Sequence, residues 1–260
     1  MENEDTIRLS IFLGLLLLFA LIEAAFPRKA RVQTRPVRWF TNLAIIVIDS
    51  AALRLLPLLA VGAAIHAGQI GWGLFNLLNW PYAVEVVLAI LILDLAIWAQ
   101  HLITHKVPLL WRFHRMHHAD RDIDVTTALR FHPIEILFSM LLKIGLVYLL
   151  GPAALAVILF EIILNGTAMF NHANIRLPLG LDRLMRLVLV TPDMHRVHHS
   201  VHRAEHDSNY GFSLSIWDRI FRTYVAQPKD GHDDMVIGLE WQDKRPSNLI
   251  WSLSLPFFRK

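Results

Sequence analysis

Five apolar stretches, separated by short polar or basic segments, dominate the pattern of hydrophobic positions along the chain. Three of them run from Ile7 to Phe26, from Leu43 to Ile65 and from Ala83 to Ile103. As helices of about 20 residues, each would cross the hydrocarbon layer of a bilayer, roughly 30 Å. Two shorter stretches, from Ile134 to Leu150 and from Ala153 to Phe170, are split by a Gly-Pro pair and predict a transmembrane or re-entrant hairpin. The pattern predicts an all-α, polytopic membrane helical bundle.

The composition supports a membrane protein and restricts its chemistry. Of the 260 residues, 55% are hydrophobic and 18% are charged, which is more apolar than a soluble core requires. Cysteine is absent, so a disulfide framework, a thiolate-held cluster and a cysteine nucleophile are all excluded. Any bound metal must therefore be held by nitrogen and oxygen. The net charge of +3 is small and forms no long basic stripe, so nucleic acid is not an expected partner.

Basic residues follow the first apolar stretch and orient the chain in the membrane. The segment FPRKARVQTRPVRW contains Arg28, Lys29, Arg31, Arg35 and Arg38. Positive loops are retained in the cytoplasm, so this loop is predicted to be cytoplasmic and the N-terminus to lie on the far side. The acidic MENED start argues against a cleaved signal peptide. On this topology the third apolar stretch returns to the cytoplasmic side, and so does the end of the hairpin.

Ionisable residues inside or beside the apolar stretches have several expected roles. Asp49 and Arg54 lie at membrane depth in the second stretch and are expected to pair. Asp94 lies two helical turns before His101, where it could accept the second N–H of a metal-bound histidine or make a helix–helix hydrogen bond. The loop from Ala119 to Phe131 contains three aspartates and is expected to be solvated, without a chemical role.

Histidines form the most distinctive motif of the chain and indicate a metal site. The segment from His101 to His118, HLITHKVPLLWRFHRMHH, contains five histidines in eighteen residues, and HRVHH repeats the pattern from His195 to His199. Residues three and four apart share one face of a helix, so the histidines of each motif can converge. One histidine alone is usually an ordinary core or surface residue. Eight at this spacing predict metal binding.

The number of histidines indicates two metal ions. Imidazole suits Zn, Cu, Fe and Ni, and one ion takes at most about six ligands, so eight or nine nitrogens would fill two coordination spheres. A zinc hydrolase of the His-Glu-x-x-His class is excluded, because HLITH and HRMHH lack the glutamate. Membrane haem is disfavoured, since haem takes axial ligands from opposite sides whereas these histidines crowd on single helix faces.

The three motifs HLITH, HRMHH and HRVHH, in this order after hydrophobic spans, resemble the histidine boxes of the membrane fatty acid hydroxylase and sterol desaturase superfamily. The intervening segments LRFHPIE, NHANI, TPDMHRVHHS and NYGFSLSIWDRIFRTY agree with this resemblance, which covers residues 85–225. One departure is Leu102, where many members have arginine. It leaves the spacing of the histidines intact.

The resemblance implies a non-haem di-iron centre with two Fe ions, O2 as co-substrate and histidine ligands. The implied ligands are His101, His105, His114, His117, His118, His132, His172, His195, His198 and His199. For His132 three roles stay open: a ligand, a hydrogen-bond partner of a ligand, or a helix-start residue. His202 and His206 are expected to be solvated or to support the ligands. His66 and His232 are expected to be structural.

The implied activity is hydroxylation or desaturation of an unactivated C–H position of a membrane lipid. Electrons are expected from a separate redox protein that docks near Arg112, Arg115 and Arg196. The lipid slot is expected to be lined by ordinary Leu, Ile, Val and Phe, so the sequence does not distinguish fatty acyl, sterol or related substrates. A histidine-rich membrane metal transporter, or a metal-binding protein without oxygenase activity, is the alternative from a different class.

These features divide the chain into three parts. Residues 1–82 are predicted to form N-terminal transmembrane helices and the basic loop. Residues 83–225 are predicted to form the histidine-box catalytic domain, with the boxes in a cap on the cytoplasmic face. Residues 226–260 are predicted to form a C-terminal tail with an interfacial segment, because NLIWSLSLPFF carries aromatic anchors.

Overall fold

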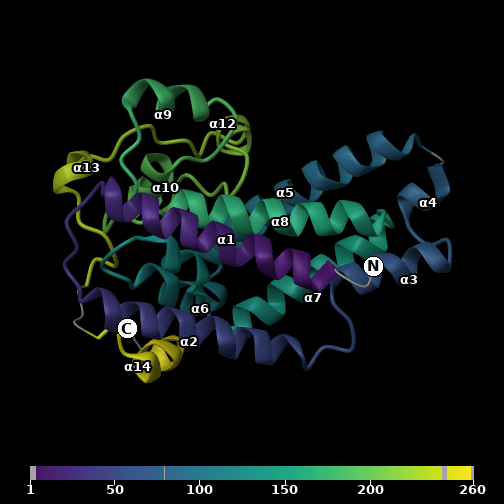
Figure 1. The fold of residues 1–260 in the computed structure, drawn as a ribbon, viewed down its shortest axis with the longest axis horizontal. Helices are drawn as coiled ribbons and strands as arrows, with labels where there is room; N and C mark the ends of the chain where they lie inside the picture. The colour runs from purple at the N-terminus through teal and green to yellow at the C-terminus, as the bar shows by residue number, and fades with distance from the viewer. Residues whose placement is uncertain (1–3, 79, 242–244, 259–260) are drawn as a thin grey trace.

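The computed structural model describes residues 4–78, 80–241 and 245–258, and long helices dominate it. The ends of the predicted N- and C-terminal parts, residues 1–3 and 259–260, lie outside the described residues. Five helices are long and apolar enough to cross a membrane: α1 (Glu4–Ala25), α2 (Arg35–Leu53), α5 (Tyr82–Lys106), α7 (Pro133–Leu150) and α8 (Ala154–His172). In Figure 1, α1, α2 and α8 run along the long axis of the molecule. The prediction of an all-α membrane bundle is confirmed.

Shorter elements occupy the two ends of this bundle (Figure 1). At one end lie α3 (Ala60–Gln69) and α4 (Leu74–Leu78). The other end carries a cap, composed of α6 (Pro108–His118), η1 (Val125–Leu129), α9 (Leu179–Met185), α10 (Pro192–His198), α11 (Arg203–His206), α12 (Ile216–Ile220), α13 (Gly231–Asp234), α14 (Leu249–Ser254) and η2 (Leu255–Phe257).

Proline and glycine set several helix boundaries. Proline is at the start of α2, α6, α7 and α10, where a missing backbone N–H costs nothing. Gly151 ends α7 in the left-handed conformation, with φ 62°. A Cβ there would lie 2.3 Å from the carbonyl oxygen of Trp72, so only glycine fits this hairpin turn. The predicted break between the two shorter apolar stretches is therefore confirmed.

The second membrane helix differs from its prediction in both boundaries and pairing. α2 begins at Arg35, inside the basic loop, because Pro36 is favourable in its first turn, and it ends at Leu53 before Pro57 can interrupt it. The expected Asp49–Arg54 pair is wrong. Residues five apart on a helix point about 140° away from each other, and here Asp49 is buried while Arg54 is exposed.

The predicted solvated loop after α6 is also wrong, because its aspartates are buried. Arg38 of α2 lies 2.8 Å from Asp120 and also contacts Asp124. Asp122 accepts the backbone N–H groups of Val32 and Gln33 at 2.9 and 2.8 Å. These contacts connect the basic loop to the cap, a tertiary arrangement that local polarity does not reveal.

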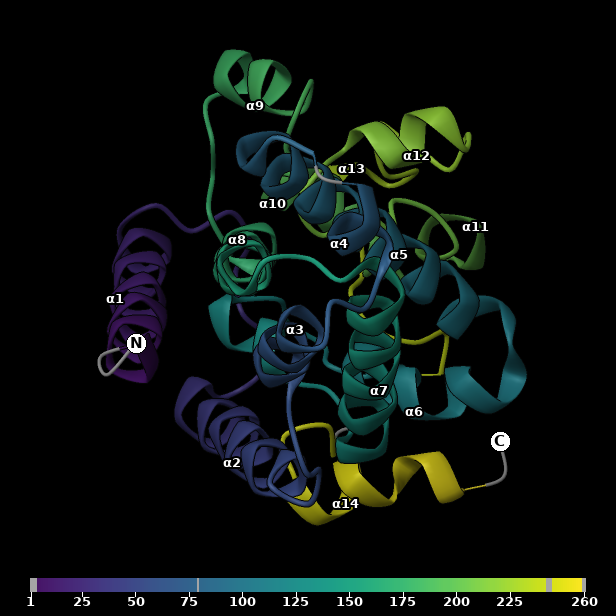
Figure 2. The same cartoon turned by 90° about the vertical axis from the view of Figure 1, so that its right-hand side faces the viewer.

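The outer surface agrees with a membrane environment. On α1, the side chains of Leu9, Leu13, Leu17 and Leu21 follow each other at four-residue spacing, and each is more than half exposed. Such a continuous apolar stripe suits contact with lipid. Figure 2, turned by 90° from Figure 1, shows α1 at one side of the bundle.

The C-terminal segment is only partly interfacial in character. Trp251 and Leu255 are buried in an apolar cluster with Ile45 and Met116, so this segment holds α2 and α6 together. Ile250 is 77% exposed and points away from that cluster.

Candidate metal centre

Nine of the ten predicted ligand histidines lie in two adjacent buried groups within the described residues. The first histidine group consists of His101, His105, His114, His118 and His198, and the second of His117, His172, His195 and His199. In each group, one nitrogen of every ring lies within 4.8 Å of the others. The first group is built from α5, α6 and α10, and the second from α6, α8 and α10.

Helix geometry explains why the two groups adjoin. Consecutive residues on a helix point about 100° apart, so His117 and His118 on α6 face different groups. His198 and His199, at the end of α10, divide in the same way. The predicted helix start is confirmed, with Thr191 accepting the backbone N–H of Met194 at 3.3 Å.

Facing ring nitrogens are separated as two ligands of one ion would be. In the first group, Nε2 of His101 lies 3.1 Å from Nε2 of His114. In the second, Nε2 of His172 lies 3.2 Å from Nε2 of His117 and 3.0 Å from Nε2 of His195. Two nitrogens that each bind a metal at about 2.0–2.1 Å have this spacing.

Several buried ring nitrogens have no hydrogen-bond partner among the described residues. Both nitrogens of His105, His118 and His199 are in this position, as are Nε2 of His198 and Nδ1 of His195. A buried polar atom without a partner costs about 1–3 kcal/mol. A metal ion binds one nitrogen of each ring, so ions bound between the rings would satisfy one atom each of His105, His118, His198 and His199, and the residues present fit a metal centre.

Hydrogen bonds to the opposite ring nitrogen orient other members of the groups. Nδ1 of His101 lies 2.7 Å from the carbonyl oxygen of Tyr210, and Nδ1 of His172 lies 2.7 Å from that of Ala168. Nδ1 of His198 lies 2.6 Å from the carbonyl oxygen of Ser208. Donating Nδ1–H to these oxygens leaves Nε2 as the lone-pair nitrogen that a metal requires.

His114 is oriented by a carboxylate, which sequence reasoning did not assign. Its Nδ1 lies 2.7 Å from Oε1 of Glu135, on the first turn of α7. The LRFHPIE motif contained this glutamate, but only the fold brings it next to a histidine of the HRMHH motif. A carboxylate behind a ligand histidine raises its basicity and fixes its ring.

Burial keeps the histidines of the cap neutral. The pKa values of His117, His118 and His199 are well below the ordinary value of 6.5, because burial disfavours the charged ring and neighbouring imidazoles add repulsion. Burial likewise lowers the pKa values of His195 and His198. Neutral imidazole is the form that binds metal, so these side chains are ready to bind at pH 7.

Two aspartates hold the loop beside the first histidine group. Asp94 accepts Nε1–H of Trp217 at 2.8 Å, which is the helix–helix alternative of the two predicted roles. Asp218, not identified from the sequence, accepts the backbone N–H groups of Tyr210 and Gly211, both at 2.9 Å. This loop supplies the carbonyl oxygen that orients His101.

The remaining histidines lie outside both groups. His132 has Nδ1 3.2 Å from the N–H of Ile134 and Nε2 3.2 Å from the carbonyl oxygen of Leu253, as a helix-start residue would. His206 stacks on Trp111 with ring centroids 5.4 Å apart. The other contacts are His202 with Asp230 at 2.6 Å, His66 with Tyr148 at 2.9 Å, and His232 with Asp193 at 3.8 Å.

The expected redox docking patch is wrong for two of its three arginines. Arg196 is fully buried beside Asp193, and Arg115 is 5% exposed. Arg115 donates to the carbonyl oxygen of Leu255 at 2.7 Å, so it stabilises the C-terminal segment. Arg112 alone of the three is exposed.

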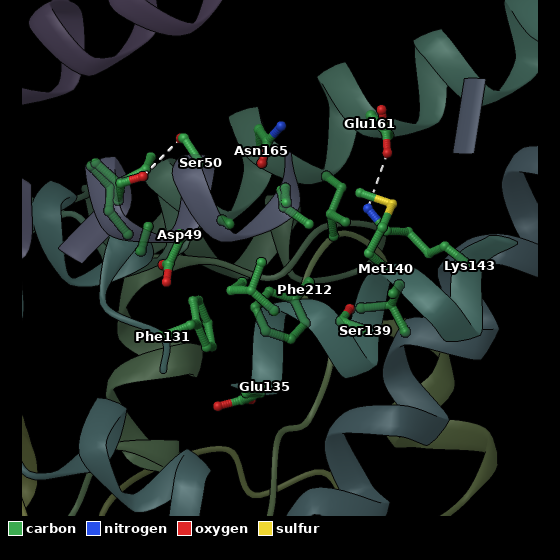
Figure 3. Close-up of a pocket in the computed structure, with 18 of the residues that line it drawn as sticks. Asp49, Ser50, Phe131, Glu135, Ser139, Met140, Lys143, Glu161, Asn165 and Phe212 are labelled. Carbon is green, nitrogen blue, oxygen red and sulfur yellow. Dashed lines mark hydrogen bonds and ion pairs between the residues drawn. The ribbon is translucent and has the colours of Figure 1, made fainter. Parts of the chain in front are cut away.

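A cavity of about 560 Å³ adjoins the first histidine group and extends into the helix bundle. His101 and His114 line it at one end, and Lys143 and Glu161 line it further along (Figure 3). Half of its lining residues are polar or charged. The prediction of a slot lined only by ordinary apolar side chains is therefore wrong. The polar residues lie on different helices, and the sequence pattern did not bring them together.

The family model of fatty acid hydroxylases matches residues 86–223, which is more than half of the chain. The chain belongs to the fatty acid hydroxylase family. The match coincides closely with the resemblance over residues 85–225. With its membrane helices and buried histidine groups, this protein is a multi-pass membrane enzyme of a lipid hydroxylase family, and its histidines can bind metal.

Individual relatives of this protein are hydroxylases or monooxygenases. It is 27% identical to the ornithine lipid hydroxylase OlsE of Rhizobium tropici over 257 residues, which cover 96% of the chain and 75% of that protein. It is 33% identical to alkylglycerol monooxygenase of Homo sapiens over 64% of the chain and 35% of that protein. Identity to cholesterol 25-hydroxylase of Homo sapiens is 26%, over 54% of the chain and 50% of the relative. No solved structure matches the chain.

Proposed function

We propose that this protein is a di-iron oxygenase that hydroxylates an unactivated C–H position of a polar membrane lipid with O2 and external electrons. The observation that carries the proposal is the pair of buried histidine groups, one of which opens onto a cavity within the membrane helices. Hydroxylation is favoured over desaturation because the relatives described above are hydroxylases and monooxygenases.

The two histidine groups would each hold one iron. Nitrogen ligands without a thiolate suit iron, and the donor count matches two coordination spheres. When bound, the two irons supply the activation of O2. His132 is left out of this ligand set because both of its ring nitrogens contact backbone groups.

The chain itself supplies rigidity and exclusion of water. Glu135 fixes the ring of His114, and backbone carbonyl groups fix those of His101 and His172. Phe131 and Phe212 line the cavity near the histidines and give that end part of its apolar surface. A lipid held in this cavity would present one carbon to the metals in a constant orientation, which is the main contribution a protein makes to such chemistry.

The proposed topology places the histidine groups on the cytoplasmic face. The basic loop is at the same end of the bundle, because Arg28 contacts Asp193 at 3.4 Å and Lys29 donates its backbone N–H to Asn174 at 3.0 Å. The positive-inside tendency then assigns this end to the cytoplasm. A separate redox protein would deliver electrons there, and the lipid substrate would arrive from the bilayer.

The alternative of a metal transporter has weaker support. A transit pathway needs polar or ionisable ligands distributed along the crossing direction. Here the nine histidines gather at one end of the bundle.

The test uses the full chain reconstituted in nanodiscs with bacterial polar lipids. We expect about two irons per chain, O2 consumption with a chemical reductant, and lipid products heavier by 16 mass units. The variant His105→Ala should lose activity, whereas His202→Ala, a histidine outside both groups, should keep it. Metal flux into proteoliposomes without O2 consumption would favour the transporter, and a loss of 2 mass units would indicate desaturation.

A further inference from the structure

Unbalanced negative charge remains in the cavity after its ion pairs are accounted for. Both lining cations are matched: Lys143 lies 3.0 Å from Glu161, and Arg8 contacts Glu161 and lies 3.3 Å from Glu4. The two cations balance Glu4 and Glu161, and Asp5, which also lines the cavity, is exposed. The carboxylate of Asp49 has no cation beside it among the residues that the structure describes.

Asp49 is the clearest unsatisfied group of the cavity. It is 5% exposed, and its Oδ1 has no hydrogen-bond partner within the described part of the chain. It projects from α2 into the cavity, toward the side where Phe131 and Glu135 lie (Figure 3). A carboxylate buried in this way is costly unless a cation or several hydrogen-bond donors reach it.

Glu135 offers a second free oxygen in the same region. Its Oε1 is used by His114, but its Oε2 is buried without a partner among the described residues. Both side chains line the cavity on the side where Phe131 lies (Figure 3). Because both carboxylates are buried on this side of the cavity, a positive group that contacts both of them would stabilise the site.

The position of these oxygens relates the charge to the metal centre. Glu135, Ser139 and Lys143 follow one another at four-residue spacing on α7 and all line the cavity. At 1.5 Å per residue, Glu135 and Lys143 are about 12 Å apart along the helix. The acidic end thus lies beside the first histidine group, and the neutralised ion pairs lie about two turns away.

We propose that Asp49 and Glu135 form an amine-binding subsite, which selects lipids whose polar head carries a cationic amine. This assignment deepens the proposed function and rests on the cavity being the lipid site. A primary ammonium has three N–H donors, enough to reach Oδ1 of Asp49 and Oε2 of Glu135 together. An anionic head would be repelled, and a hydrocarbon chain would leave both oxygens unsatisfied.

The subsite also bears on which part of the lipid reacts. Glu135 contacts His114 directly, so an amine bound to Glu135 lies close to the metal centre. The carbons next to the amine, in the polar head, are then closer to the histidines than the ends of the acyl chains are.

The experiment measures binding, without turnover, by the full chain in nanodiscs under argon without reductant. The probes are N-dodecanoyl-1,4-diaminobutane, which has a free primary amine, and its N-acetylated form, which is neutral and has the same chain. Wild type should bind the amine at least about 30-fold more tightly, the effect of one buried charge pair. Asp49→Asn should remove this preference while leaving the affinity for the acetylated probe unchanged, and Asp49→Glu should retain a clear preference.

Controls separate specific from general effects. Asp230→Asn makes the same chemical change on the cap, outside the cavity, and should bind both probes as wild type does. Equal binding of the two probes by wild type, or an equal loss of both in Asp49→Asn, would overturn the subsite. If the amine preference depends on Asp49 but the protein never adds oxygen to a lipid, the proposed function is contradicted and the subsite is not. Hydroxylation without any preference for the amine would contradict only the subsite.

Discussion

Both histidine groups are buried, but they have different surroundings. The first group includes His101 and His114, which line the cavity, and a carboxylate orients one of its rings. No member of the second group lines the cavity within the described residues. There His117 lies flat on Phe131, with ring centroids 4.5 Å apart and an interplanar angle of 10°, and the backbone orients His172. We infer that the two groups have different roles: the first group faces the lipid in the cavity, and the second completes the metal centre on the side away from the cavity.

Removing histidines from one group at a time should have the largest effect on metal content and activity, and it tests whether the two groups are separate sites. The variant His105→Ala/His118→Ala leaves three histidines in the first group, and His195→Ala/His199→Ala leaves two in the second. Each should lose about one metal ion per chain and all measurable activity, because the proposed chemistry needs both ions. Metal content by mass spectrometry and product formation are the measurements.

Helix content by circular dichroism serves as the control for these variants, since both should retain the membrane bundle. If either pair of substitutions released both ions, the two groups would be one cooperative site and the comparison would fail.

Acid should disrupt both groups together in the metal-free protein. Burial lowers the pKa values of His117, His118, His195, His198 and His199 well below 6.5, so the unfolded chain binds more protons than the folded one as pH falls below 6.5. Their contribution to stability is complete above the unfolded value and decreases toward lower pH. Between pH 7.5 and 5.5 the loss is about 1.4 kcal/mol for each such histidine.

Thermal unfolding of the metal-free and metal-loaded protein at the two pH values checks this expectation. Both forms should lose stability at pH 5.5, and the metal-loaded form should lose at least as much, because the protons responsible bind to the histidines of the unfolded chain. An unfolding temperature independent of pH in the metal-free protein would contradict the lowered pKa values.

The sequence was sufficient to predict the long helices and nine of the histidines that lie together in the two groups. Their signals are local: runs of about 20 apolar residues, and histidines at three- and four-residue spacing. The division of His117 from His118 follows from the same helix periodicity, although only the packing of α10 against α8 shows which group each joins.

What the sequence did not reveal depends on contacts between distant segments. Asp120 and Asp124 read as solvated until Arg38, more than 80 positions away, is placed beside them. Arg196 reads as part of a basic surface although it is fully buried. The polar lining of the cavity has the same origin, because Asp49 and Glu135 are single exceptions in two otherwise apolar helices. A hydropathy pattern averages such exceptions away.

Truncation of Glu135 should weaken metal binding by the first group only. The change Glu135→Ala removes the carboxylate from Nδ1 of His114, and loss of such a partner usually costs 10- to 100-fold in metal affinity or activity. Competition with a chelator should therefore show one weakened ion and one unchanged ion. Equal weakening of both would mean that the carboxylate supports the whole centre.

The smallest effect is expected at His132, the predicted ligand that lies outside both groups. Its Nδ1 accepts the N–H of Ile134 at the start of α7, so His132→Ala should remove a helix cap, which is worth about 1 kcal/mol of stability, without loss of metal. Asparagine is a favourable capping residue, so His132→Asn should restore the stability. Unfolding temperature and metal content distinguish the two roles, because a ligand would show its loss in the metal content of both variants. A fall in metal content in His132→Asn as large as in the double variants would return His132 to the ligand set and extend the first group toward α7.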